Sequence, residues 1–159
     1  MRILVVSDTH GDLQHLESVL SEEDDFDMLL HCGDICGDED RVRQLVMCAF
    51  LGVAGNMDFS GRFPRDRVVE AGGKKIFMSH GHRLGVNFDT ETLVSEAVSE
   101  GADIALYGHT HVPEIHTQQG IWVMNPGSLS YPRQRDRRPS YGVIEIGDDG
   151  SITCEIRYL

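Results

Sequence analysis

Five short apolar runs, each stopping at side chains that can bind a metal ion, constrain this chain more than any other feature. The runs are "RILVVS" before Asp8 and His10, "DMLLHC" before Asp34, "FLGVA" before Asn56, "KKIFMS" before His80 and His82, and "ADIALY" before His109 and His111. Burying an unpaired carboxylate costs on the order of several kcal/mol, so a cluster of such ends needs a compensating cation. The pattern predicts buried strands whose carboxyl ends meet at one metal-binding edge.

Segments with helical periodicity alternate with the first of these runs, which is typical of an α/β fold. The helical patterns cover residues 12–23, residues 38–49 and the segment from Thr90 to Ser99. The rest is rich in hairpin patterns, with turns at Gly72 and Gly73, at Gln119 and Gly120, and from Asp148 to Gly150. No linker composition interrupts the sequence, so we expect a single domain over residues 1–159.

Composition excludes several classes of protein. The net charge of −12 disfavours extended nucleic acid as a partner, because a surface that binds phosphate backbones needs a basic excess. No apolar run reaches the roughly 18 residues of a membrane span, and the first residues do not resemble a signal peptide, so we expect a cytoplasmic protein. The four cysteines lack paired zinc spacing; Cys32 and Cys36 are either reduced thiols near the core or metal ligands.

The side chains at the strand ends also narrow the kind of metal. Two Asp, one Asn and four His form a mixed oxygen and nitrogen set without thiolate, which suits manganese, iron, cobalt, nickel or zinc better than calcium or magnesium. Seven ligands are too many for one tetrahedral ion, but they suit two ions that share a carboxylate. The simpler alternative is that these residues are polar caps on five unrelated loops. The candidate ligands are Asp8, His10, Asp34, Asn56, His80, His109 and His111.

The same motifs, in the same order, resemble a known family. "DTH" (8–10), "GD" (33–34), "GN" (55–56), "SHGH" (79–82) and "GHTH" (108–111) are similar to the motifs of the calcineurin-like metallophosphoesterases. With "NPGSLSYPR" (125–133), the chain most resembles the small YfcE-like phosphodiesterase branch. The resemblance implies an α/β, four-layer metallophosphatase-like fold, in which two mixed β-sheets pack as a sandwich flanked by helices.

The resemblance further implies which residue serves which ion. Asp8, His10 and His111 would bind the first metal, Asn56, His80 and His109 would bind the second, and Asp34 would bridge both. His109 and His111 lie two residues apart, and on an extended segment they would point the same way toward different ions. The implied cofactors are two divalent transition-metal ions, Mn²⁺ first, with Ni²⁺, Fe²⁺ and Zn²⁺ as alternatives.

The implied activity is hydrolysis of a small phosphodiester by a metal-bridging hydroxide, with Asp34 and Asn56 among the catalytic residues and Asn56 also contacting substrate. Larger family members carry "GNH" where this chain has "GNMD" (55–58), so the histidine that assists the leaving group is absent. Asp58 either replaces it as a catalytic group or is a turn aspartate. His82 either contacts substrate in catalysis or supports its neighbour His80.

One basic stretch, "YPRQRDRRPS" (131–140), offers Arg133 as a substrate-binding residue, the alternative being a solvated loop. A different class of function also fits the resemblance, because the retromer scaffold subunit has this fold and works mainly by binding other proteins. Hydrolysis of polymeric DNA or RNA is the third and least favoured function, because a nuclease needs a wider basic surface than this single Arg-rich stretch. Small family members often associate, so the resemblance leaves a homo-oligomer open beside a monomer.

Overall fold

Ten strands in two mixed sheets form the centre of the structure, a computed structural model that describes all residues from 1 to 159. The first sheet has the order β10-β9-β1-β2-β3 and the second the order β4-β5-β6-β8-β7. The first contains β1 (Arg2–Val6), β2 (Met28–His31), β3 (Ala49–Gly52), β9 (Ser140–Ile146) and β10 (Ile152–Tyr158). The second contains β4 (Asp66–Ala71), β5 (Lys74–Ser79), β6 (Ile104–Leu106), β7 (Glu114–Gln118) and β8 (Ile121–Asn125).

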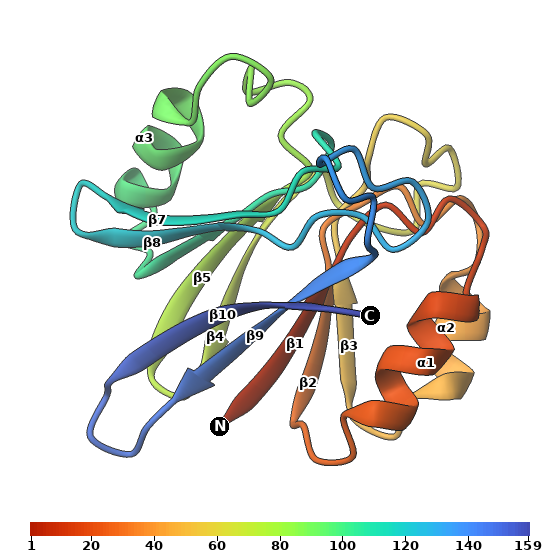
Figure 1. The fold of residues 1–159 in the computed structure, drawn as a ribbon. Coiled ribbons are helices and arrows are strands. Elements are labelled where there is room, and N and C mark those ends of the chain that lie inside the picture. Colours follow the sequence, from red (N-terminus) through yellow and green to blue (C-terminus); the bar gives the residue numbers. More distant parts are fainter.

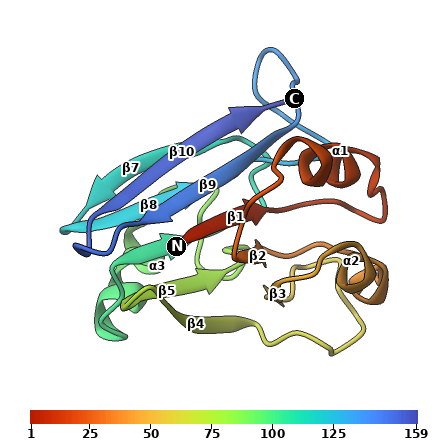
Figure 2. The same ribbon diagram turned by 90° about the horizontal axis from the view of Figure 1, so that it is seen from below.

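The two sheets pack face to face with helices outside them (Figures 1 and 2). The helices α1 (Gln14–Glu22) and α2 (Glu39–Leu45) cover the first sheet, and α3 (Glu91–Ser99) covers the second. Alternation along β1 explains the layers: Ile3 and Val5 face the second sheet, whereas Leu4 and Val6 face the two helices. The α/β class predicted from the sequence patterns and the sandwich flanked by helices implied by the family resemblance are therefore both confirmed.

The main differences from the predicted elements lie at their ends. The second helix was expected to continue to residue 49, but it ends at Leu45, and Val46 already has extended backbone angles. The early end has a tertiary cause, because Ala49–Gly52 pair in parallel register with Met28–His31 and so belong to β3. None of the three helices combines the length and apolar composition that crossing a membrane requires.

Strand direction brings the functional candidates together. Strands β1, β2 and β3 run parallel to one another, as do β5, β6 and β8. The loops that follow these strands gather at one edge of the sandwich, at the top of Figure 1. Because the predicted ligands lie directly after strands, the topology collects them at this edge.

Just after the C-terminal end of α1, the buried carboxylate of Glu23 binds side chains from three strands, β1, β9 and β10. It accepts hydrogen bonds from the Tyr141 hydroxyl at 2.8 Å and from Nη1 of Arg157 at 2.7 Å, and it pairs with Arg2. Burial by itself would raise the pKa of Glu23, but the hydrogen bonds from its three partners outweigh burial and lower that pKa from 4.5 to about 2.

We expect Glu23→Gln to destabilise the protein by about 1–3 kcal/mol near neutral pH, because it removes a charged acceptor from buried donors. A depressed carboxyl pKa stabilises the fold above the unfolded value of 4.5, and this contribution is lost as pH falls toward 2. The difference from wild type in urea unfolding should therefore shrink between about pH 5 and pH 2. The exposed neighbour Glu22→Gln is the control; an equal effect of both variants at all pH values would contradict the prediction.

Candidate metal centre

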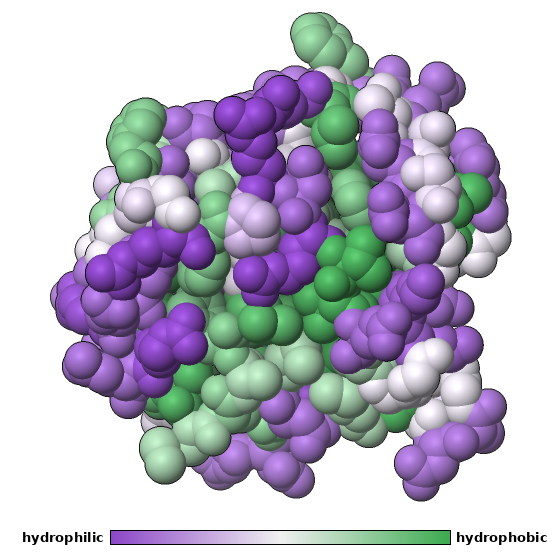
Figure 3. All heavy atoms as spheres, turned by 180° about the vertical axis from the view of Figure 1, so that it is seen from behind, coloured by the Kyte–Doolittle hydropathy of each residue, from purple (hydrophilic) through white to green (hydrophobic).

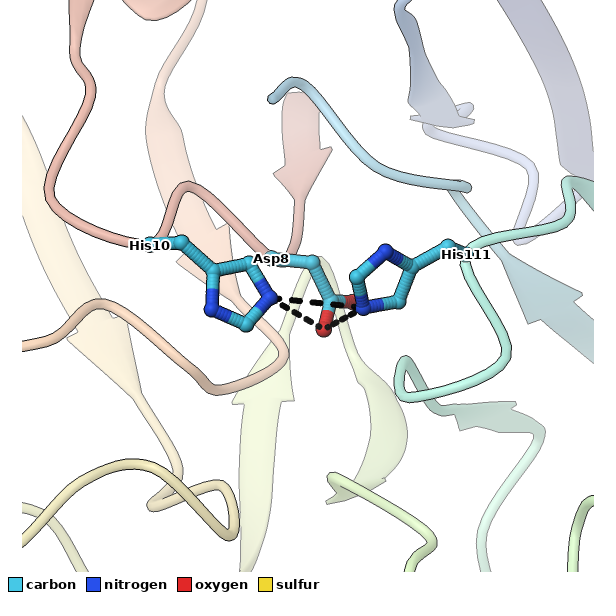
Figure 4. A group of neighbouring side chains, drawn as sticks. All are labelled: Asp8, His10 and His111. Carbon is cyan, nitrogen blue, oxygen red and sulfur yellow. Dashed lines mark hydrogen bonds and ion pairs between the residues drawn. The ribbon is translucent and has the colours of Figure 1, made fainter. Parts of the chain in front are cut away.

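Two overlapping groups of ligand atoms lie where the strand ends meet. The first group is Asp8, His10 and His111, and the second is Asp8, Asp34 and His80; within each group the ligand atoms lie within 4.8 Å of one another. Figure 4 shows the rings of His10 and His111 turned toward the Asp8 carboxylate from two different loops. Apart from Asp8 and His10, which share one loop, the members of each group are far apart in sequence, so the fold brings them together.

Asp8 lies at the centre of the two groups and is fully buried. Its Oδ2 accepts hydrogen bonds from the Ser7 hydroxyl at 2.6 Å and from the backbone N–H of His109 at 3.1 Å. Its Oδ1 has no hydrogen-bond partner, although Nε2 of His111 lies 3.1 Å away and Nε2 of His10 lies 3.6 Å away. Burial alone would raise the pKa of Asp8, but the neighbouring imidazoles outweigh it and hold that pKa well below its usual range.

A buried, ionised oxygen without a hydrogen-bond donor needs a compensating cation, and the imidazole nitrogens around it can serve as further ligands of that cation. The donor set therefore fits a transition metal bound by nitrogen and oxygen.

Asp34 faces both groups. Its Oδ2 lies 3.5 Å from Nε2 of His80 and 3.8 Å from Nε2 of His10. Its other oxygen, Oδ1, accepts the backbone N–H of Met57 at 2.7 Å, which fixes the orientation of the carboxylate. This carboxylate belongs to the second group and also lies within 4 Å of a histidine of the first, so it is close to the ligands of both.

Two of the imidazoles are oriented by backbone carbonyl groups. Nδ1 of His80 donates to the carbonyl of Cys32 at 2.7 Å, and Nδ1 of His111 donates to the carbonyl of Tyr131 at 2.7 Å. Metal-binding histidines usually donate their second ring nitrogen in this way, which leaves the other nitrogen to the ion. Here Nε2 of both rings faces the carboxylates of the site.

Asn56 and His109 complete the set of seven but lie nearer the rim. Oδ1 of Asn56 lies 3.1 Å from Nε2 of His80, next to the second group. The ring centroid of His109 lies 5.2 Å from that of His80, while its Nε2 contacts the Asn87 side chain at 2.9 Å. The structure therefore brings both residues to the site, with His109 oriented by a residue that the sequence did not indicate.

Backbone conformation marks the same residues. Positive φ angles occur at eight residues other than glycine, and five of these are predicted ligands: Asp8, His10, Asp34, His109 and His111. Such angles cost on the order of 1–3 kcal/mol each and concentrate at functional sites. They also correct one expectation. His109 (φ 68°) and His111 (φ 59°) are not on an extended segment, because left-handed turns aim their rings at the site.

Three further candidates surround the ligands. The ring centroid of His82 lies 5.4 Å from that of His80, and its buried Nδ1 has no hydrogen-bond partner. Arg133 is exposed, and its backbone N–H donates to the carbonyl of His111 at 2.9 Å. The Asp58 carboxylate accepts three backbone N–H groups of the two loops that carry Asp34 and Asn56.

Several supporting residues were not assigned roles from sequence. The Ser128 hydroxyl donates to the carbonyl of Asp8 at 2.9 Å, and the Ser130 hydroxyl donates to the carbonyl of Thr9 at 2.6 Å. The Asn125 side chain donates to the carbonyl of Gly108 at 2.9 Å. Their sequence signal is the segment "NPGSLSYPR" (125–133), which begins at the last residue of β8 and contributes to the family resemblance.

Most of this chain matches a known protein family. Residues 1–149 match the model of the calcineurin-like phosphoesterase superfamily domain. The chain belongs to this superfamily. As a calcineurin-like phosphoesterase it is 32% identical over 152 residues to the probable metallophosphoesterase YsnB of Bacillus subtilis, covering 95% of this chain and 88% of YsnB. It is 27% identical to the phosphodiesterase YfcE of Escherichia coli K12, covering 91% of this chain and 88% of YfcE.

Solved structures agree with the fold of this phosphoesterase. A conserved uncharacterised protein from Streptococcus pneumoniae TIGR4, named a predicted phosphoesterase, is 32% identical with a TM-score of 0.80, and the match covers 99% of this chain and 97% of the other. Vps29 of Entamoeba histolytica, solved in complex with Zn²⁺, is 28% identical with a TM-score of 0.77, and the match covers 99% of each chain. The superfamily is metal-dependent, which agrees with the chemistry of the donor set described above.

Proposed function

We propose that this calcineurin-like phosphoesterase holds two divalent transition-metal ions and hydrolyses a small phosphodiester. The observation that carries the proposal is the unpartnered Oδ1 of Asp8 among imidazole nitrogens, with Asp34 facing both ligand groups. The first ion would be held by Asp8, His10, Asp34 and His111, and the second by Asp34, Asn56, His80 and His109. Mn²⁺ is the first candidate, followed by Ni²⁺, Fe²⁺ and Zn²⁺, since these ions share the same ligand types.

Two such ions, when bound, supply a nucleophilic hydroxide at neutral pH and charge stabilisation of the phosphoryl oxygens. The chain's own residues fix the geometry. Asp34 keeps the two ligand groups in register, and the buried hydrogen bonds of Asp8 prevent its carboxylate from rotating away. Asn56 and His82, both next to His80, are the proposed contacts to the phosphoryl group.

A diester with a good leaving group suits this site better than a monoester. Met57 occupies the position after Asn56, so no imidazole follows that residue to protonate a poor leaving group. An open groove of about 500 Å³ begins beside the His109 partner Asn87 and gives room for one ester substituent. The relative YfcE is named a phosphodiesterase, which supports the same substrate class.

The test of this proposal is metal analysis of the purified protein combined with hydrolysis of bis(p-nitrophenyl) phosphate and p-nitrophenyl phosphate. We expect about two bound transition-metal ions per chain and a rate that a chelator abolishes and Mn²⁺ restores. We also expect a higher kcat/KM for the diester than for the monoester. Absence of bound metal together with absence of turnover under every divalent ion would overturn the proposal.

Arg133 is the proposed contact to a second anionic group of the substrate. Its segment borders the first ligand group, because the Tyr131 ring lies 5.3 Å from that of His10 and the Tyr131 carbonyl orients His111. An exposed guanidinium there can approach a phosphate in bidentate fashion.

We expect Arg133→Ala to raise KM for phosphodiesters about five- to tenfold with little change in kcat, because it removes a contact shared by ground and transition states. Arg41→Ala, on the exposed face of α2, is the matched control and should leave KM unchanged. Unchanged KM values for several phosphoesters in the Arg133 variant would remove this residue from the site.

A protein-binding scaffold is the second candidate function. The similarity to Vps29 supports it, and hydrophobic residues gather near the middle of the face shown in Figure 3. Turnover of a phosphoester separates the two functions. Metal binding alone does not, because Vps29 of Entamoeba histolytica was itself solved in complex with Zn²⁺. Self-association into a homo-oligomer is compatible with both, and sedimentation analysis would measure it.

A further inference from the structure

The carboxylate of Asp58 ties together the two loops that carry Asp34 and Asn56. We propose that Asp58 is a positioning residue that fixes the bridging aspartate and the second metal site, and that it does not donate a proton to the leaving group. The inference deepens the proposed function and rests on it for its catalytic consequence. Its structural part concerns the metal-free chain and stands independently of any activity.

The hydrogen bonds of Asp58 use both of its oxygens. Oδ2 accepts the backbone N–H of Asp34 at 2.7 Å and that of Gly55 at 2.8 Å, and Oδ1 accepts the backbone N–H of Cys36 at 2.7 Å. Asp34 and Cys36 belong to the loop between β2 and α2, whereas Gly55 belongs to the loop between β3 and β4. A single side chain therefore holds the residue before Asn56 and the bridging ligand at fixed separation.

The backbone of the first loop is shaped to receive a carboxylate. Asp34 and Cys36 have φ angles of 57° and 59°, and Gly33 has a φ angle of 104°. Left-handed residues in such a turn direct successive N–H groups to one side and form an anion-binding concavity, or nest. Asp58 occupies this nest, and its charge strengthens each of the three hydrogen bonds.

The connection is reciprocal. While Asp58 accepts the N–H of Asp34, the carboxylate of Asp34 accepts the N–H of Met57 at 2.7 Å. Each aspartate thus binds the backbone of the loop that carries the other. We call this pair of contacts between Asp34 and Asp58 the aspartate clasp.

The same contacts argue against proton donation by Asp58. A carboxyl group that donates must carry a proton on one oxygen, and that oxygen loses acceptor strength toward the N–H groups it now satisfies. Protonation of Asp58 would therefore weaken its hydrogen bonds to the backbone N–H groups of the nest, and the ligands would be held less firmly during the reaction. A displacement of about 1 Å at a ligand can reduce a rate about 100-fold, so a clasp that prevents such displacement contributes to catalysis without touching substrate.

The experiment compares Asp58→Asn with Asp24→Asn, a control that makes the same change at an exposed residue. Asp58→Asn keeps the shape of the side chain but turns an amide donor toward backbone donors. In metal-free protein we expect faster hydrogen exchange at the amides of Asp34, Cys36 and Gly55 in this variant only. Calorimetric titration with Mn²⁺ should show affinity for the second ion reduced at least tenfold.

Kinetics with aryl phosphodiesters then separates positioning from proton donation. If Asp58 only positions the ligands, kcat of Asp58→Asn should fall about 100-fold, and the decrease should be the same whether the leaving group is p-nitrophenol or phenol. Loss confined to the phenol ester, with unchanged Mn²⁺ affinity and amide exchange, would overturn the inference in favour of proton donation. If wild type itself binds no metal, the proposed function fails, while the exchange measurement still decides whether the clasp exists. Should Asp58→Asn not fold, Asp58→Ser gives the same comparison.

Discussion

Asp34→Asn is expected to lower kcat for a phosphodiester by about three orders of magnitude or more, the largest loss of any single ligand substitution. Its Oδ2 faces both ligand groups, at 3.5 Å from Nε2 of His80 and 3.8 Å from Nε2 of His10. An amide that replaces this carboxylate removes negative charge from both proposed metal sites at once. Metal content should fall below two ions per chain.

The fold should survive this substitution, because Asn keeps an oxygen that can accept the N–H of Met57. Steady-state kinetics, metal analysis and thermal unfolding of Asp34→Asn and of the exposed control Asp24→Asn measure the three effects separately. Full activity with two bound metals in the Asp34 variant would refute the bridging assignment. Reduced activity with an unfolded chain would point to a structural role instead.

Gly55→Ala is expected to disrupt the metal centre by a steric route. A Cβ atom at residue 55 would lie 2.0 Å from Oδ1 of Asp34 and 2.5 Å from the Asp34 backbone nitrogen. A rotation of the Asp34 side chain relieves only the first contact, so the two loops must move apart. We expect loss of metal binding, a decrease in kcat of about 100-fold, and destabilisation by about 1–3 kcal/mol.

Gly61→Ala is the matched control, because Gly61 is in the same loop and a Cβ there meets nothing within 4 Å. Its φ of 68° makes the control mildly unfavourable, by about 1–2 kcal/mol, without touching the metal centre. Urea unfolding and Mn²⁺ titration of both variants separate strain from site disruption. Wild-type metal affinity in Gly55→Ala would show that the loops tolerate a side chain there.

Much of the fold was predictable because it follows from local patterns. Each run of apolar residues is a strand, and the alternation of inward and outward residues along β1 fixes the two sides of the first sheet. The end of α2 was not predictable, because residues 46 to 49 continue the helical pattern of the sequence. In the structure Ala49 pairs with Met28 of β2 and is the first residue of β3. Strand pairing overrode helix propensity at that point.

The chemistry of the site was also visible in the residue types, whereas its geometry was not. The seven candidate ligands could be named because costly polar side chains directly follow buried strands. No sequence pattern indicated that left-handed turns direct His109 and His111 to the site. None indicated that Asn87 contacts His109. The role of Asp58 was open for the same reason, because its partners are backbone groups of another loop.

The sequence by itself determined the fold class, the superfamily motifs and the chemical type of the metal ligands, because apolar periodicity and residue type are local properties. Tertiary structure alone decided which oxygen of Asp8 is left without a donor, how Asp34 faces both ligand groups, and which carbonyl groups orient His80 and His111. These features depend on side-chain to backbone contacts between residues as far apart as Asp8 and Ser128. Only the packing of two sheets brings such residues within hydrogen-bonding distance.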